Sequence, residues 1–287
     1  MRPGLAASIG AVGLSLLLAG CSSGGTRPGA IRHSTTSSSA TTTSAAPPTT
    51  SPPSSSASTT TTAPPPPFPA VVVQAMAQFV PLPAGAEAPL RLPPVSGYLT
   101  AQTGGLGGED NVTLIATPSP VPVNSPDLTS SGGTELASFS TTPTASTSNA
   151  SSSLSQAKGQ SIDACGGPSV PETLSGGTAA TSCPTLDGEA LDWTFEGWSV
   201  QVITLSGTSP STAEADQVQS ALSSSGVPTS SGNGFVTVEV PANSSVGSSD
   251  TAAVEWVVGA DLYQVRSSDN PVGAIQTAAA MRPYPGA

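Results

Sequence analysis

The stretch AAVEWVVGADLYQVRSSDNPVGAIQTAAAMRP, residues 252–283, carries the most complete secondary-structure pattern in the chain. Apolar and polar residues alternate on both sides of Gly259-Ala260, which is typical of two strands joined by a tight turn. Asn270 is a favoured N-cap residue and Pro271 a favoured first helical residue, so a helix should start here and end before Pro283. Its expected apolar face consists of Val272, Ile275 and Ala279. The stretch therefore predicts a strand–turn–strand–helix unit, here called a ββα unit.

An earlier stretch has the same order of elements. Residues 192–205, DWTFEGWSVQVITL, predict a hairpin with its turn at Glu196-Gly197. Ser211 and Glu214 then form a capping box, and Gly226 supplies the end of the helix that follows. The expected buried face of this helix consists of Ala215, Val218 and Leu222.

Two ββα units fit an α+β fold, an antiparallel sheet with helices on one face, to which residues 234–241 (GFVTVEVP) add a strand. A third, degenerate unit is expected from two strand-like stretches, 111–120 and 134–142, followed by a serine-rich helix over 144–159. Residues 68–83, FPAVVVQAMAQFVPLP, form either an entry strand or a helix.

The expected strands carry aromatic residues, among them Trp193, Trp198, Phe235, Trp256 and Tyr263. They could line a groove for an apolar or sugar ligand, with Trp198, Trp256 and Tyr263 as the candidates, or they could fill the hydrophobic core. Only 4% of the residues are aromatic, which favours the core for most of them, with the groove as the alternative.

The pattern near the C-terminus resembles that of the LolA/RseB-like envelope proteins, secreted carrier and sensor domains in which strands curve over helices. The residues that carry the resemblance are VEWVVGADLYQV (254–265) and AIQTAAAM (274–281). The resemblance implies a carrier or sensor role outside the cytoplasm.

The start of the chain predicts where the protein resides. Arg2 is the only charge before an uncharged run from Leu5 to Ala19, long enough for a secretory signal but shorter than the roughly 20 residues of a spanning helix. The run ends in Leu18-Ala19-Gly20-Cys21, which resembles the lipobox of bacterial lipoproteins. The resemblance implies that Cys21 receives a diacylglyceryl group and becomes the mature N-terminus. An ordinary secretory signal with an incidental cysteine is the alternative.

Residues 1–20 are therefore interpreted as a signal peptide and residues 21–67 as a tether. Between Ser22 and Pro67, 33 of 46 residues are Ser, Thr or Pro. Such a composition buries too little apolar surface to fold. We expect a disordered spacer, with or without O-linked sugars, that precedes a globular part of two segments, 68–164 and 165–287.

Two cysteines follow the tether. Cys165 and Cys183 lie in the segment from Asp163 to Leu191, where glycine and proline predict a loop. After a secretion signal, a disulfide that closes about 19 residues is favoured over free thiols, and it would contribute about 3 kcal/mol. Two cysteines without histidines do not fill the four positions of a zinc site, so no metal or other cofactor is expected.

The globular part contains no histidine, because the only one in the chain is His33 in the tether. This excludes Ser-His-Asp and Cys-His catalysis there. The strings Ser155-Gln156-Ala157-Lys158 and Ser268-Asp269-Asn270 resemble two motifs of the penicillin-recognising serine enzymes, but no K-T-G motif follows. No catalytic residue is therefore assigned.

Acidic residues are the remaining candidates for catalysis. Two carboxylates that share a cleft could act in a hydrolase. The candidate groups are Glu109-Asp110, Asp187 with Glu189 and Asp192, and Glu239 with Glu255.

From Phe68 onward, 18 acidic and four basic residues give a net charge of −14, which disfavours nucleic acid and anionic lipid headgroups as partners. The single lysine and the abundance of small residues resemble proteins of high-GC actinobacteria. We expect a lipid-anchored protein on the outer face of a bacterial cytoplasmic membrane or in the cell envelope. Its module is expected to be non-catalytic and to bind an envelope protein or a small apolar ligand. A lipid carrier and a carboxylate-dependent hydrolase are the alternatives.

Overall fold

The computed structural model describes residues 68–104, 110–205, 212–228, 233–241, 250–268 and 270–287. The helices in these ranges are α1 (Ala70–Met76), α2 (Thr147–Ser161), α3 (Thr212–Ser225) and α4 (Pro271–Ala279), with 3-10 turns at Pro126–Thr129 and Ser175–Gly177. The strands are β1 (Glu87–Pro89), β2 (Tyr98–Gly104), β3 (Asp110–Thr117), β4 (Thr134–Pro143), β5 (Val170–Thr173), β6 (Ala179–Pro184), β7 (Gly188–Phe195), β8 (Trp198–Leu205), β9 (Gly234–Val240), β10 (Thr251–Val258), β11 (Asp261–Ser267) and β12 (Met281–Pro283).

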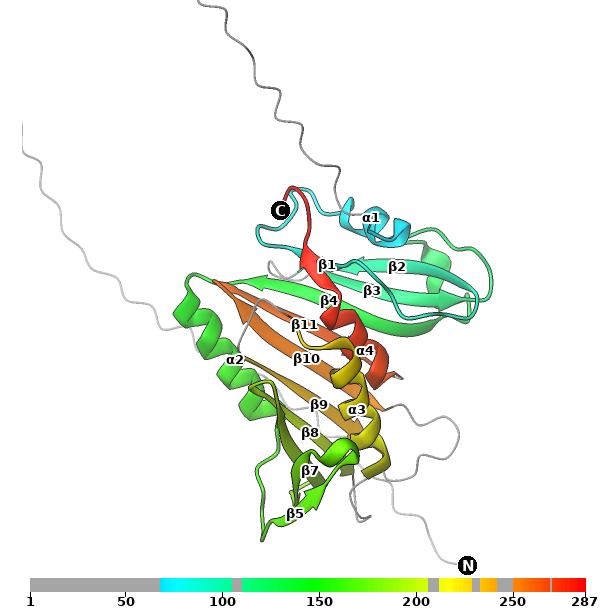
Figure 1. Ribbon diagram of the computed structural model, residues 1–287. Helices are drawn as coiled ribbons and strands as arrows, with labels where there is room; N and C mark the ends of the chain where they lie inside the picture. The colour runs from blue at the N-terminus through cyan, green and yellow to red at the C-terminus, as the bar shows by residue number, and fades with distance from the viewer. Residues whose placement is uncertain (1–67, 105–109, 206–211, 229–232, 242–249, 269) are drawn as a thin grey trace, which may run out of the picture. The chain divides into compact units, whose positions relative to one another are not determined.

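Ten of these strands form one sheet in the order β2-β3-β4-β11-β10-β9-β8-β7-β6-β5, while β1 pairs with β12 (Figure 1). Neighbouring strands are antiparallel except β8 and β9, which are parallel because α3 carries the chain across between them. Strand β4 pairs with β11, so the segments 68–164 and 165–287 share this sheet. The expected α+β class is confirmed.

The C-terminal ββα unit consists of β10, β11 and α4. Asn270 caps the helix, since its Oδ1 accepts a hydrogen bond of 2.8 Å from the backbone N–H of Gly273, and Pro271 is the first helical residue. The expected buried face was only partly correct, because Ala274, Ile275 and Ala278 are buried while Val272 and Ala279 are half-buried. Small residues let the helix lie close to the sheet. The helix ends at Ala279, and the residues up to Pro283 form β12.

The other expected ββα unit consists of β7, β8 and α3. Its turn has positive φ angles of 49° at Glu196 and 86° at Gly197, a conformation that matches the twist of a hairpin. Gly226 ends α3 with a φ of 75° and a hydrogen bond of 2.8 Å from its N–H to the carbonyl oxygen of Leu222. The three residues expected on the buried face, Ala215, Val218 and Leu222, are all buried. Ser211 lies outside the described residues.

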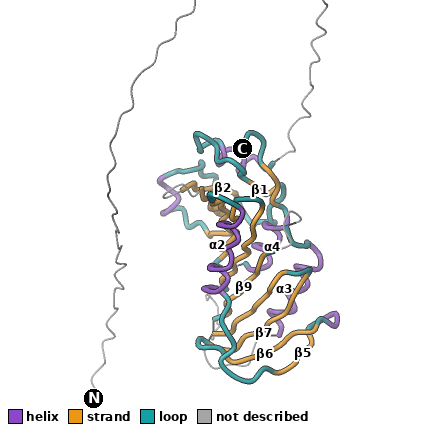
Figure 2. The backbone as a smooth tube through the Cα atoms, turned by 90° about the vertical axis from the view of Figure 1, so that its left-hand side faces the viewer, coloured by secondary structure: helices purple, strands orange, loops and turns teal. Residues whose placement is uncertain are grey.

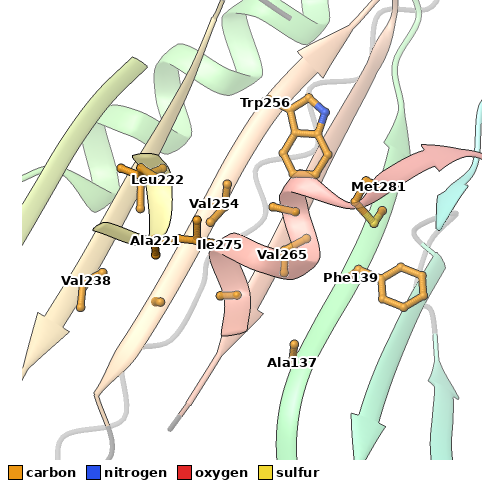
Figure 3. Packing of buried hydrophobic residues seen from close by; sticks show 14 of the residues in the cluster. Ala137, Phe139, Ala221, Leu222, Val238, Val254, Trp256, Val265, Ile275 and Met281 are labelled. Carbon is orange, nitrogen blue, oxygen red and sulfur yellow. The ribbon is translucent and has the colours of Figure 1, made fainter. Parts of the chain in front are cut away.

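The degenerate unit is present as β3, β4 and α2, but its helix lies on the other side of the sheet from α3 and α4. Helix α2 contacts β9, β10 and β11, and with Val257 its residue Leu154 lines one cavity. Helix α4 lies against Val254 of the same strand (Figure 3). Side chains alternate between the two faces of a strand, so Val257 and Val254 point in opposite directions. The expectation of helices on one face therefore holds for α3 and α4 and not for α2 (Figures 1 and 2).

The expectation of a loop from Asp163 to Leu191 was wrong. This segment contains β5, β6 and the first half of β7. Strand β5 is short and lies at the edge of the sheet, a position that tolerates Pro171 because half of the backbone N–H groups there have no strand to pair with. In this segment, proline and glycine therefore indicate a strand at the edge of the sheet and not a loop.

The face covered by α3 and α4, here called the core face, carries the main hydrophobic core. One row of paired residues across this face is Val200, Val236, Val254, Val265 and Phe139, all at most 3% exposed. Figure 3 shows Ile275 and Met281 lying over this row. The three predicted groove residues, Trp198, Trp256 and Tyr263, are also buried here.

Residues 68–83 contain a helix, α1, and not a strand. Phe68 lies with its ring centre 5.0 Å from that of Tyr284, so the entry to the globular part contacts the C-terminal segment. Within the described residues, no helix is both long and apolar enough to cross a membrane.

Candidate functional site

The face opposite the core face, here called the α2 face, is largely polar. One row of paired residues is Ser199, Phe235, Glu255, Gln264 and Ser140, and the next is Gln201, Thr237, Ala253, Arg266 and Ser138. Helix α2 packs mainly against β9 to β11, and its C-terminal turn reaches β8, where Lys158 contacts Ser199. The alternation that buries valine on one face therefore gathers hydroxyl, amide and charged groups on the other.

Lys158 of α2 stands between two cavities on this face. Its Nζ donates a hydrogen bond of 2.6 Å to Ser199 Oγ. A cavity of about 320 Å³ on one side is lined by residues that include Ser151, Leu154, Ser155, Asn233, Phe235 and Val257. A cavity of about 480 Å³ on the other side is lined by residues that include Ile162, Thr181, Asp192 and Thr194. Lys158 and Ser199 line both, and we call the two cavities together the Lys158 groove.

The chain after α2 is fixed to the sheet beside the groove. The side-chain amide of Gln201 donates to the carbonyl oxygen of Asp163 and accepts from the N–H of Asp163, both at 2.9 Å. The same amide donates to Asp192 Oδ1 at 2.8 Å. Gln201 is fully buried, so these bonds satisfy polar groups that would otherwise be costly. They position the C-terminal end of α2, and with it Lys158.

The disulfide reinforces the same junction. Cys165 and Cys183 are bonded with their Cα atoms 5.5 Å apart, which joins the segment after α2 to β6 as expected. The two sulfur atoms lie 3.8 and 3.7 Å from Asp192 Oδ2. Burial raises the pKa of Asp192, although the hydrogen bond from Gln201 opposes this shift. Among the described residues, this trio is the one cluster with metal-ligand spacing, but bonded sulfurs are not thiolates, so it is not a metal site.

A buried carboxylate lies under α2. Glu255 is 1% exposed, accepts a hydrogen bond from Gln264 Nε2, and lies 3.6 Å from Arg266 Nη2. Burial raises the pKa of Glu255, while Gln264 and Arg266 lower it. Because both partners come from β11, the group stabilises the pairing of β10 with β11.

The resemblance to penicillin-recognising enzymes does not extend to geometry. Ser155 Oγ donates to the carbonyl oxygen of Ser151 at 2.8 Å, and Lys158 binds Ser199 instead. Ser268 lines a separate cavity of about 370 Å³ that does not include Ser155. Asp269 lies outside the described residues.

The paired acids expected from the sequence do not form a shared cleft in the described structure. Asp192 and Glu189 are three residues apart on β7, so their side chains point to opposite faces of the sheet. Glu239 pairs with Thr251, four residues along β10 from Glu255. Glu109 lies outside the described residues.

The aromatic residues are core side chains. Trp198 and Trp256 are 0% exposed and Tyr263 is 2% exposed. The rings of Trp256 and Tyr263 stack with centres 5.4 Å apart, and Trp198 lies 6.4 Å from Trp256. None of the cavities described here is lined by these three rings. The suggestion that these three rings line a ligand groove is therefore corrected, since they fill the core, as favoured for most of the aromatic residues. Two other aromatic residues of the expected strands do line the Lys158 groove, Trp193 in its larger cavity and Phe235 in its smaller one.

The sequence contained a weak signal for the Lys158 groove. Ser199 and Gln201 alternate with Trp198 and Val200 on β8, a pattern that indicates a strand with a polar face. Ser199 contacts Lys158 of the serine-rich helix α2, whose position on this face no local pattern predicts. Cys21, the tether and His33 lie outside the described residues.

The chain matches no protein-family model, no curated protein and no solved structure. The lipobox and the LolA/RseB-like resemblance stay predictions.

Proposed function

We propose that this protein is a lipid-anchored envelope protein whose globular part is a non-catalytic binding module, with the Lys158 groove as its binding surface. The observation that carries the proposal is the pair of cavities of about 320 and 480 Å³ that meet at Lys158 and Ser199. Volumes of this size are typical of ligand sites, which combine a few fixed polar groups with apolar contacts.

The groups in the groove suit the binding of a polar ligand. Lys158 Nζ and Ser199 Oγ lie side by side, joined by a hydrogen bond of 2.6 Å, and offer an N–H donor and a hydroxyl. The hydroxyls of Thr181 and Thr194 and the amide of Asn233 offer hydrogen bonds, and Leu154 offers an apolar contact. This set suits a polar ligand or a polar segment of an envelope partner.

The chain that follows α2, at one wall of the groove, is tied to the sheet without any ligand. Gln201 and the disulfide hold the chain after α2 on the sheet. A wall that is already ordered loses little conformational entropy on binding, which supports the binding role.

The anchor is the part of the proposal that rests on the sequence. Two or more acyl chains at Cys21 would keep the protein on a membrane stably, which a single chain does not. In the natural host, the wild-type protein should label with an alkyne fatty acid and sediment with membranes. Cys21→Ala should abolish the label and release the protein, and an unlabelled wild-type protein would overturn the anchor.

Native mass spectrometry of the mature protein, released from membranes of its own host, tests the binding surface. We expect a bound adduct of constant mass that disappears in Thr194→Trp, where a large ring would fill the groove. Thr134→Trp, on the exposed start of β4, is the matched control and should keep the adduct.

The other outcomes separate the alternatives. An adduct that survives Thr194→Trp would remove the Lys158 groove from the proposal. A turned-over substrate that depends on one carboxylate would replace binding by hydrolysis, and a lipid adduct at an unrelated position would favour the carrier alternative.

A further inference from the structure

Another cavity, separate from the Lys158 groove, lies at the C-terminal ends of α3 and α4. It has a volume of about 520 Å³ and is closed on one side by the segment that follows β1. Its charged lining residues are Arg91 from that segment and Arg282 from β12. Leu90, Leu92 and Pro93 contribute an apolar wall.

The charge of this cavity is opposite to that of the globular part around it. From Phe68 onward the chain has four basic residues, and two of them line this one cavity. None of its lining residues is acidic. With a net charge of −14 over the same residues, a concave surface with two guanidinium groups is a local site for an anion.

Backbone contacts hold the segments that carry the two arginines side by side. Ala88 of β1 pairs with Arg282 of β12, and the N–H of Leu90 donates to the carbonyl oxygen of Ala280 at 3.0 Å. Arg282 Nη1 donates to the carbonyl oxygens of Ala279 and Met281. These bonds use one nitrogen of a group that carries five N–H donors in a plane, so the guanidinium is oriented while donors remain for a ligand.

The carboxyl of Glu87 interacts electrostatically with Arg282 from outside the cavity. Glu87 is 5% exposed, and burial raises its pKa to about 7, against the lowering effect of Arg282. Glu87 does not line the cavity. Near neutral pH this carboxyl is therefore charged only part of the time.

We propose that this cavity binds a single-chain anionic amphiphile, with its carboxylate or phosphate group on Arg91 and Arg282 and its chain on the apolar wall. The volume is in the usual range for one small ligand. Arginine suits both headgroups, because its planar fork donates two parallel hydrogen bonds to either. This site is independent of the proposed function of the Lys158 groove.

Calorimetric titration of the chain from residue 21 onward, with Cys21→Ser so that no acyl chain of its own competes, tests the proposal. The probes are octanoate and octyl phosphate, below their micellar concentrations, and octyltrimethylammonium is the cationic control. We expect at least one anion to bind with one site per chain, and the cation not to bind. If both anions bind, the one with the lower dissociation constant identifies the preferred headgroup. If only one binds, its headgroup is the one that the cavity accepts.

Arg91→Gln should weaken binding of the anion about tenfold or more, as loss of a charge-assisted hydrogen bond does. Gln156→Glu, an exposed change on α2, alters the net charge by the same amount and should leave binding unchanged. Arg282→Lys keeps the positive charge but lacks the two parallel N–H donors of the guanidinium. We expect it to weaken anion binding less than Arg91→Gln does. The proposal fails if neither anion binds, if the cation binds equally well, or if Arg91→Gln binds like the wild type.

Discussion

The two faces of the large sheet use the same strands for different purposes. Glu255 and Trp256 are neighbours on β10, both at most 1% exposed, yet they lie on opposite faces. Trp256 contacts the rings of Tyr263 and Trp198, whereas Glu255 contacts Gln264 and Arg266. The core face is sealed by apolar contacts, and the α2 face combines hydrogen bonds with open cavities.

This difference indicates how stability and binding are divided. Burial of apolar area is the largest favourable contribution to folding, so the core face should dominate the free energy of unfolding. Polar groups on the α2 face add little net stability, because they exchange bonds with water for bonds within the protein. They are the groups that a ligand could use.

The largest expected effect is on the core face. Trp256→Ala removes a fully buried ring and should lower the free energy of unfolding by about 3–5 kcal/mol. Denaturant unfolding measures this loss. The half-buried Val257, next in the chain and on the α2 face, is the control, and Val257→Ala should cost about 1 kcal/mol. Equal losses of unfolding free energy in Trp256→Ala and Val257→Ala would show that the core face does not contribute more to stability than the α2 face.

The disulfide, on the α2 face, should make the next largest contribution to stability. Replacing both Cys165 and Cys183 by alanine should cost about 3 kcal/mol, because the cross-link restricts the unfolded chain over about 19 residues. Denaturant unfolding of the double variant, compared with the oxidised wild type, measures this cost. A loss much below 1 kcal/mol would mean that hydrogen bonds such as those of Gln201 are enough to hold this junction.

The two buried carboxyls differ in their partners. Oε2 of Glu87, beside the core, has no hydrogen-bond partner among the described residues, while Glu255 has two partners. Burial raises the pKa of Glu87 from 4.5 to about 7, against the lowering by Arg282 and with a further rise from Asp261. The folded state therefore holds this proton more tightly than the unfolded chain. The contribution of the protonated Glu87 carboxyl to the free energy of unfolding is complete below about pH 4.5. It is lost as the pH rises to about 7.

Glu87→Gln should remove this pH dependence. Relative to the wild type it should be more stable by about 2 kcal/mol at pH 8 and by little at pH 4.5, since glutamine carries no charge to desolvate. Unfolding curves at both pH values measure this difference. If Glu87→Gln is no more stable than the wild type at pH 8, attraction by Arg282 offsets the cost of burying the charged Glu87 carboxylate.

The smallest expected effect on stability is in the Lys158 groove. Lys158 is exposed, so Lys158→Gln should change the free energy of unfolding by less than about 1 kcal/mol. The same variant should lose the adduct seen by native mass spectrometry. A loss of stability above about 2 kcal/mol would instead make Lys158 a structural residue.

The sequence predicted the elements whose signals are local. Alternation of apolar and polar residues identified β8, β9 and β10, and the caps at Asn270 and Gly226 identified the start of α4 and the end of α3. Strands β5 and β6 were missed because Gly176, Gly177 and Pro171 interrupt any alternation.

Arrangements that depend on distant contacts were not predictable. The pairing of β4 with β11 joins segments far apart in the sequence, and the parallel pair β8–β9 depends on the path of α3. The serine-rich α2 has no strong apolar stripe to indicate which face of the sheet it covers. The Lys158 groove was missed for the same reason, since Lys158 and Ser199 are 41 residues apart.

Crosslinking in the natural host, with a photoreactive residue at Thr194 in the Lys158 groove or at Thr134 outside it, shows directly whether a ligand or partner binds the α2 face. We expect one discrete crosslinked product from position 194 that is lost when Lys158→Gln is added, and no such product from position 134. Identical products from both positions, or a product from position 194 that persists without Lys158, would contradict the assignment of binding to the α2 face.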